Sequence, residues 1–173
     1  LVVSDGLGVV ARYTLAGVLS GSVQLKPLGV LPSVVTAFSP DGKFALGDSY
    51  ALYETLKGYP LARLRTDTMR PGLLSSGAIS GDDKFIVGQT ESLRAWSSEG
   101  GKEKYDIYSR DDPSQALALS YDGSTLATGH ASSTIDVRDA RTGKIRVTIA
   151  AGPPSVQSLR WTEGSLVVGQ YNA

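Results

Sequence analysis

Cysteine is absent from this 173-residue chain, and histidine occurs once, as His130. Without cysteine the chain can form neither disulfides nor thiolate metal sites. A single histidine leaves few pairs of a nucleophile and a general base, and no nucleophile-elbow sequence accompanies it. Scattered carboxylates around one histidine also lack the ligand spacing of a metal site. We therefore predict no catalytic residue, no bound metal and no cofactor, and we expect that the chain is not an enzyme.

The chain also lacks an excess of charge of either sign. Seventeen basic and seventeen acidic residues give a formal net charge of zero. A nucleic-acid binder that neutralises phosphates needs a basic face, so the charge balance argues against that class of protein. A local basic patch around Arg63, Arg65 and Arg70 keeps a nucleic-acid-associated protein as an alternative.

Long apolar runs and targeting sequences are missing as well. No run approaches the roughly twenty apolar residues of a membrane span. The start, Leu1-Val2-Val3-Ser4-Asp5, has neither an initiator Met nor the charged region of a signal peptide. It begins in the middle of an apolar strand, which is typical of a piece of a longer chain. We expect an intracellular, cytoplasmic location, although the absence of cysteine does not by itself fix the compartment.

Glycine and proline, with 20 and 8 residues, are abundant, whereas long helical faces are hard to find. Short runs of Val, Leu, Ile and Thr are bounded by Gly, Asp, Ser and Pro, which indicates closely spaced strands. Thr134-Ile135-Asp136-Val137-Arg138 alternates with the two-residue period of a half-buried strand. The fold class is therefore predicted to be all-β.

One turn recurs along the chain at a nearly constant spacing. It reads Ser39-Pro40-Asp41-Gly42, then Ser80-Gly81-Asp82-Asp83, then Ser120-Tyr121-Asp122-Gly123, with a worn copy at Thr162-Glu163-Gly164. The acidic residue moves from 41 to 82, 122 and 163, which indicates a repeat of about forty residues. Asp accepts hydrogen bonds from nearby backbone N–H groups and Gly tolerates positive φ. Asp41, Gly42, Asp82, Asp122 and Gly123 are therefore predicted to form structural hairpin turns, as are Thr142 and Gly143 later in the third unit.

Each full unit is predicted to contain four short strands. These lie at 34–38, 43–47, 50–54 and 61–65; at 74–79, 84–88, 91–96 and 104–108; and at 115–119, 124–128, 133–138 and 144–149. A strand around Pro27 is expected at a sheet edge, where the missing N–H costs least. Four-stranded units at this period predict a β-propeller, because a single blade cannot bury both its faces. A single propeller portion then spans 1–173, with units at about 1–30 (partial), 34–67, 74–108, 115–150 and 155–173 (partial).

The best-matching stretch, Ala118–Gly129 followed by Ser133–Lys144, resembles the WD40 repeat family. The family pattern is a Ser-x-Asp-Gly turn, a strand ending in Ser-Gly or a variant, an Ile-x-Val-Trp-Asp strand and a Thr-Gly-Lys turn. Arg138 stands where the Trp is expected and Asp139 keeps the Asp, whereas Ala95-Trp96-Ser97 keeps the Trp. The family uses a hydrogen-bonded set of His, Ser or Thr, Asp and Trp, and no unit has all four. We therefore expect divergent blades that rely on apolar packing.

The resemblance implies a ring of seven or eight blades, whereas this chain holds about four blade equivalents. We expect an arc of a larger ring whose missing blades come from the rest of the chain or from a partner; a small closed ring is the alternative. The resemblance further implies a non-catalytic protein–protein interaction scaffold, a subunit of a multiprotein complex.

A rim of the propeller is the predicted partner-binding site. The residue after the glycine or serine that ends each second strand is polar, and we expect these residues to lie in exposed turns: Asp5, Asp48, Gln89, His130 and Gln170. Arg70 and Arg110, in the linkers that enter the blades, should reach the same rim. Exposed turn residues are usually polar in any case, so a site without function stays an open alternative. Trp96 and Trp161 are expected to pack between blades.

The quinoprotein-type propeller is a second possible resemblance. Asp139-Ala140-Arg141-Thr142-Gly143-Lys144 fits the Ala-x-Thr-Gly turn of its repeats once. Such a protein would be an assembly factor or, with a bound quinone, an enzyme. The recurring Ser-x-Asp-Gly turns favour the WD40 resemblance.

Overall fold

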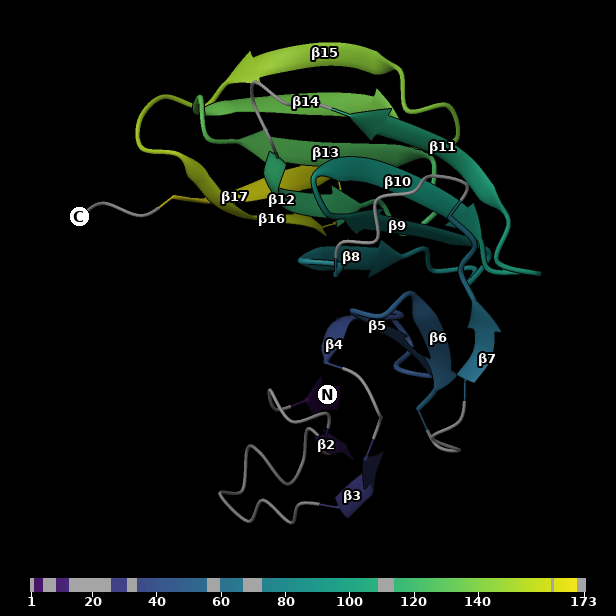
Figure 1. Cartoon of the computed structure of the whole chain (residues 1–173). Coiled ribbons are helices and arrows are strands. Elements are labelled where there is room, and N and C mark those ends of the chain that lie inside the picture. Colours follow the sequence, from purple (N-terminus) through teal and green to yellow (C-terminus); the bar gives the residue numbers. More distant parts are fainter. Residues whose placement is uncertain are drawn as a thin grey trace.

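Five antiparallel sheets follow one another in chain order around an open arc (Figure 1). The computed structural model describes residues 2–4, 9–12, 26–30, 34–55, 60–66, 73–108, 114–162 and 164–170, and for the first three of these ranges only the strands. These parts of the chain contain no helix, so none that is long and apolar enough to cross a membrane. The predicted all-β propeller class is confirmed.

Three sheets have four strands each, in the order of the sequence. The first blade holds β4 (Val35–Phe38), β5 (Phe44–Gly47), β6 (Ala51–Glu54) and β7 (Pro60–Arg63). The second blade holds β8 (Ser76–Ile79), β9 (Phe85–Gln89), β10 (Ser92–Ser97) and β11 (Glu103–Tyr108). The third blade holds β12 (Ser114–Leu119), β13 (Thr125–His130), β14 (Thr134–Asp139) and β15 (Ile145–Ala150).

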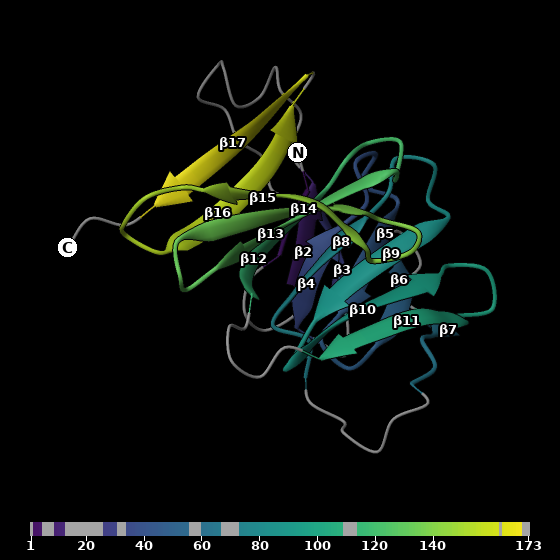
Figure 2. The ribbon, with the colours of Figure 1, turned by 90° about the horizontal axis from the view of Figure 1, so that it is seen from above.

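Two smaller sheets flank the blades. An N-terminal sheet holds β1 (Val2–Ser4), β2 (Val9–Arg12) and β3 (Lys26–Val30), and a C-terminal hairpin holds β16 (Val156–Thr162) and β17 (Ser165–Gln170). Pro27 lies in β3, at the edge of its sheet as predicted. The first strands of successive sheets pack side by side, β4 with β8, β8 with β12 and β12 with β16. They form the inner side of the arc, from which the sheets extend towards β7, β11 and β15 (Figure 2).

Apolar side chains fill the interfaces between successive sheets. Leu46, Leu52, Ile86 and Trp96 pack between the first and second blades, and Trp96 is fully buried. The indole Nε1 of Trp96 donates a hydrogen bond to the carbonyl oxygen of Arg65 at 2.8 Å. Between the second and third blades the core is Val87, Leu93, Ala95, Leu126 and Ala140. Trp161 packs against the third blade and donates to the carbonyl of Ala118 at 3.1 Å, so both tryptophans belong to blade packing.

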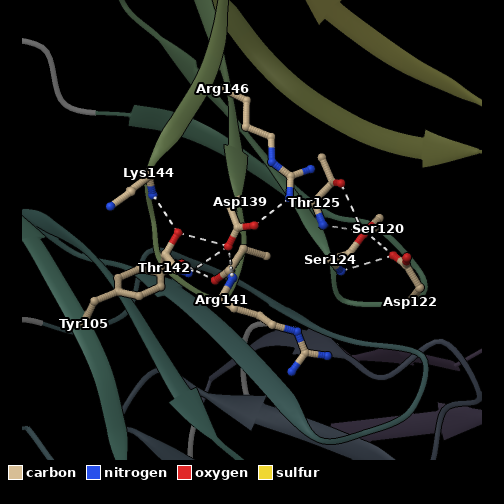
Figure 3. A network of polar contacts seen from close by, with 11 residues as sticks. Tyr105, Ser120, Asp122, Ser124, Thr125, Asp139, Arg141, Thr142, Lys144 and Arg146 are labelled. Carbon is tan, nitrogen blue, oxygen red and sulfur yellow. Dashed lines mark hydrogen bonds and ion pairs between the residues drawn. The ribbon is translucent and has the colours of Figure 1, made fainter.

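The recurring turns share one hydrogen-bond pattern. In the first blade the Ser39 hydroxyl donates to Asp41 Oδ1 at 2.7 Å, and the Lys43 amide donates to the same oxygen at 2.9 Å. The Phe44 amide donates to Ser39 Oγ at 3.0 Å. The same three bonds recur around Ser80 and Asp82 and around Ser120 and Asp122 (Figure 3 shows the last). Each sequence thus folds its own turn, independently of the neighbouring blades.

A second kind of turn closes the outer hairpin of the third blade, next to the Ser120 turn (Figure 3). Asp139 Oδ1 accepts hydrogen bonds from the amide and the hydroxyl of Thr142, both at 3.0 Å. Asp139 Oδ2 accepts from Arg146 at 2.5 Å. Gly143 has a φ of 72°, which glycine adopts without strain. Thr142 and Gly143 therefore hold the frame of the hairpin.

These turns make the stability of the fold sensitive to acid. Hydrogen bonds from Ser120 and Ser124 lower the pKa of Asp122 from 3.8 to about 2, and bonds from Lys43 and Ser39 lower that of Asp41 to about 2. Because the folded-state pKa values lie below the unfolded ones, the stabilisation is complete above pH 3.8 and is lost as the pH falls through about 2. Urea unfolding between pH 5 and 2 measures this dependence. At pH 5 an Asp41→Asn/Asp122→Asn variant should have a lower free energy of unfolding than the wild type, and this free energy should fall less as the pH is lowered. Glu99→Gln, which lies outside the Ser-x-Asp turns, serves as the control, and an equal dependence of stability on pH in all three proteins would contradict the prediction.

Candidate functional site

The predicted rim positions fall at the ends of second strands, but they do not form one exposed row. Asp48 directly follows β5 and is half-buried, whereas Gln89, His130 and Gln170 are the last residues of β9, β13 and β17. Gln89 and His130 are only 3% and 5% exposed, so the prediction that they lie in exposed turns is wrong. Three other predicted rim residues lie outside the described residues: Asp5, Arg70 and Arg110.

The reason for the error is a difference of one residue in strand length. Gln89 pairs with Leu93 across β9 and β10, and its counterpart in the third blade is Gly129, which pairs with Ile135. His130 lies one position further, because β13 has six residues and β9 has five. Since successive side chains of a strand point to opposite faces, this step sends Gln89 and His130 in opposite directions. Gln89 reaches towards the third blade, where its Oε1 accepts a hydrogen bond from the Ser114 hydroxyl.

His130 instead joins a buried polar cluster on the face that the third blade turns towards the second. Asp136 lies at its centre and accepts hydrogen bonds from Arg138 and Thr148, each at 2.6 Å. His130 Nε2 lies 3.3 Å from Asp136 Oδ2. Arg138 also donates to the Thr128 hydroxyl at 3.3 Å and to the Gly143 carbonyl at 3.1 Å. We call these residues the Asp136 cluster.

The Asp136 cluster adds a buried polar network within the third blade to the apolar packing between the blades. Arg138 stands where the WD40 pattern has Trp, and its Nε donates to a Thr of the second strand. A charged network thus occupies a position where the family pattern has an aromatic side chain. The second blade places Arg94 where the third has Asp136, since Arg94 pairs with Gly88 and Asp136 with Thr128. Arg94, 2% exposed, lies 3.3 Å from Asp106, so the second blade carries the opposite charge at this position.

The geometry around His130 is not that of a catalytic relay. Thr128 Oγ1 and Asp136 Oδ2 approach the same ring nitrogen, Nε2, at 3.2 and 3.3 Å. A Ser-His-Asp relay needs the hydroxyl and the carboxylate on different ring nitrogens. Thr128 is fully buried, and the cavity beside it has a volume of about 10 Å³, close to the size of one water molecule. His130 and its neighbours therefore hold the strands of the third blade together.

Gln170 also has a structural role at its strand end. Its side-chain amide donates to the carbonyl oxygens of Gly152 and Pro154, both at 2.6 Å. These bonds fix the loop that leads from β15 into β16. Within the described residues, no group of three or more His, Asp or Glu side chains is arranged to hold a metal ion.

A groove with a volume of about 1050 Å³ lies between the first and second blades. Its apolar lining is Phe44, Leu52, Leu61, Ala62 and Leu64. The hairpin between β10 and β11 supplies Ser98, Glu99 and Gly100 on the opposite side. Arg63, Arg65 and Asp83 add charges of both signs. Sequence reasoning named Arg63 and Arg65 only as a basic patch and missed the groove between them and the hairpin.

Comparison with known proteins identifies the fold to which this structure belongs. No protein-family model matches the chain, and no curated protein matches it. Among solved structures, the chain is similar to the beta-propeller domain of Myceliophteria thermophila Cps50 (Swd1), with a TM-score of 0.73 and 15% sequence identity. The match covers 98% of this chain and 58% of that chain. The fold is a WD40-like β-propeller.

This propeller portion spans less than two thirds of the Cps50 chain that it matches. The predicted resemblance and the predicted open arc are thereby confirmed at the level of the fold. At 15% identity the likeness carries no statement about ligands or partners.

At the groove, the turn between β8 and β9 differs from the corresponding turns of the first and third blades. Asp83 has a φ of 58°, at the position where Gly42 and Gly123 have 72° and 67°. Its Oδ1 is buried and has no hydrogen-bond partner among the described residues. Desolvation by burial raises the pKa of Asp83. A strained backbone and a desolvated carboxylate therefore coincide in one residue.

Asp83→Gly should stabilise the propeller portion by about 1 kcal/mol at pH 7, because the relief of left-handed strain exceeds the extra unfolded-state entropy of glycine. The raised pKa means that the folded state binds its proton more readily than the unfolded state, so the unfavourable contribution of the carboxylate fades as the pH falls. The gain from Asp83→Gly should accordingly shrink in acid. Thermal unfolding at pH 7 and pH 3 measures this, with Asp82→Gly in the same turn expected to destabilise. A gain that grew in acid would refute the argument.

Proposed function

We propose that this propeller portion is a non-catalytic scaffold for protein–protein interaction within a larger assembly. The observation that carries the proposal is an uncovered apolar face on the third blade. Val147 and Ile149 lie on one face of β15 with exposed fractions of 50% and 43%, and Ile145, 51% exposed, lies on the other side of a register shift in the strand. A contiguous apolar face of this kind is typical of an interaction site.

The second blade shows how such a face is covered inside the arc. Tyr105 and Ile107 of β11 correspond to Val147 and Ile149 of β15. In the second blade Tyr105 pairs with Ala95 and Ile107 with Leu93, and in the third blade Val147 pairs with Val137 and Ile149 with Ile135. The third blade covers Tyr105 and Ile107 with its outer hairpin at Gly143. In the described part of the chain the C-terminal hairpin has two strands, of which β16 packs on β12 and β13, nearer the axis. Two further strands beside β17, from the rest of the chain or from a partner, would cover β15 in the same way.

The contacts of the charged residues support a scaffold over the two alternatives. His130, the single histidine, is engaged by Asp136 and Thr128, which favours a structural role over catalysis. Arg63 and Arg65 share their groove with Asp83 and Glu99. Carboxylates among the cations disfavour a phosphate backbone as the ligand. The rim positions Asp48 and Gln170 remain proposed partner contacts of the scaffold.

Sedimentation velocity of the purified chain tests the proposal. The wild-type chain should self-associate at micromolar concentrations, and Val147→Lys/Ile149→Lys should shift it towards the monomer. Leu73→Lys, which changes a side chain that is 69% exposed elsewhere, is the matched control and should leave association unchanged. If the wild-type chain is monomeric, or if association survives both lysines, β15 is not an interaction surface and the proposal fails.

A further inference from the structure

The repeat itself shows what the groove between the first and second blades is shaped to hold. At the next interface the corresponding space is filled by Tyr105, whose ring lies against Gly143 and whose hydroxyl donates to the carbonyl oxygen of Ala140 at 2.9 Å. Ring burial together with this hydrogen bond anchors the second blade on the outer hairpin of the third. The interface is thereby closed by one aromatic side chain.

The first blade lacks this side chain. Ala62 pairs with Leu52 across β6 and β7, just as Tyr105 pairs with Ala95 across β10 and β11. The rest of the surroundings is conserved within the repeat, since Gly101 lies against the backbone of Arg63 and Leu64 as Gly143 lies against Tyr105 and Ile107. Ser98 is the counterpart of Ala140, because the amide of Ser98 donates to the carbonyl oxygen of Lys84 just as the amide of Ala140 donates to that of Ser124. The volume of a phenol ring is therefore missing between Ala62 and Ser98.

We propose that the groove binds a tyrosine side chain of an extended peptide segment belonging to a protein partner. The ring would lie on Phe44, Leu52 and Ala62, and its hydroxyl would donate to the carbonyl oxygen of Ser98. The proposal rests on the proposed scaffold function and names a second surface for it, apart from β15. Aromatic anchors in apolar pockets are the residues that dominate many protein interfaces.

Two further features of the groove favour a peptide. Phe44 and Ala62 pack directly on the buried core of Leu46, Leu52, Ile86 and Trp96, so the groove continues an existing blade interface. Arg63 and Arg65 flank it together with Glu99 and Asp83, and charges of both signs complement a peptide that carries both signs. The buried and unpartnered Oδ1 of Asp83 offers an acceptor to a backbone or side-chain donor of the same peptide.

The side-chain analogue p-cresol is the probe for the test, titrated into the ¹⁵N-labelled full chain by NMR. Binding should shift the amides of Ala62, Ser98 and Gly100, and toluene, which lacks the hydroxyl, should bind more weakly. Ala62→Tyr fills the groove with a tyrosine of the chain itself, so it should weaken p-cresol binding at least tenfold and raise the midpoint of thermal unfolding. Val34→Tyr adds a tyrosine at an exposed position and should leave binding unchanged.

Ala62→Leu provides a second, smaller filling if Ala62→Tyr does not fold, and it should weaken binding severalfold. Absence of p-cresol binding to the wild-type chain overturns the proposal, as does equal binding to the folded Ala62 variants or shifts at other amides. These outcomes concern the groove alone. Loss of association in the Val147→Lys/Ile149→Lys variant would still support the scaffold function. The two experiments therefore distinguish a failure of the tyrosine-binding proposal from a failure of the scaffold proposal.

Discussion

Asp136→Ala is expected to destabilise the propeller portion by about 3–5 kcal/mol, the range found when one partner of a buried ion pair is removed. Asp136 and Arg138 are only 8% and 9% exposed. Without the carboxylate, the guanidinium of Arg138 loses its 2.6 Å partner, and His130 and Thr148 lose theirs. An unpaired buried charge is the most costly outcome of a single substitution in this cluster.

A double-mutant cycle separates the cost of breaking the Asp136–Arg138 ion pair from the net contribution of that pair to stability. Arg138→Met alone leaves Asp136 uncompensated and should also cost several kcal/mol, whereas Asp136→Ala/Arg138→Met removes both charges and should cost much less than the two single losses added together. Urea unfolding gives the four free energies of unfolding. Thr134→Ala, on the same strand but with a hydroxyl that bonds to that of Ser132 outside the cluster, is the control and should cost about 1 kcal/mol or less. Additive single losses would show that Asp136 and Arg138 are not coupled.

The fold could be predicted because its signals are local. Each Ser-x-Asp turn is built by residues within five positions of one another, so its sequence alone dictates the hairpin. The interval between turns then fixes the blade, and short strands between glycines leave little room for helices. The twelve strands predicted between 34 and 149 are all present, with their ends displaced by at most two residues.

The rim could not be predicted because the same small displacement inverts a strand's faces. Gln89 lies nine residues after Ser80, whereas His130 lies ten residues after Ser120, so counting from the turns gives the correct match of Gln89 with Gly129. Counting from the final glycine of each strand hides the difference. Burial of both side chains follows from contacts between blades, which no single repeat encodes.

The groove was missed for a related reason. Leu46 and Leu52, which pair across β5 and β6, lie six residues apart, but the corresponding pairs lie eight apart in the second blade (Val87 and Ala95) and ten in the third (Ala127 and Val137). Because these separations differ by two residues from blade to blade, the same face of each strand stays buried. The outer strands, however, no longer recur at a fixed period of forty residues. A fixed period therefore matches Ala62 with Glu103, and only the strand register matches it with Tyr105.

Gly101→Ala should destabilise the junction of the first and second blades far more than the same change at the adjacent Gly100. Both glycines have positive φ, 69° for Gly100 and 63° for Gly101, so both alanines carry the left-handed strain of about 1–2 kcal/mol. A Cβ on Gly100 meets nothing within 4 Å. On Gly101 it would lie 2.5 Å from the carbonyl oxygen of Arg63 and 3.2 Å from the Cα of Leu64. Backbone atoms cannot rotate away as a side chain does, so overpacking adds about 1–3 kcal/mol at Gly101 alone.

The location of this clash determines what unfolds. The Gly101 carbonyl accepts a hydrogen bond from the Arg65 amide at 2.9 Å, and Arg65 in turn accepts from Trp96, so the substitution strains both bonds that join the blades there. Hydrogen exchange of Gly101→Ala should therefore show faster exchange in residues 34–66 than in the third blade, while Gly100→Ala should keep the wild-type pattern. Unfolding free energies measured by urea should differ between the two variants by the overpacking cost. Equal free energies, or uniform loss of protection along the chain, would mean that the first blade is not held to the second through Gly101.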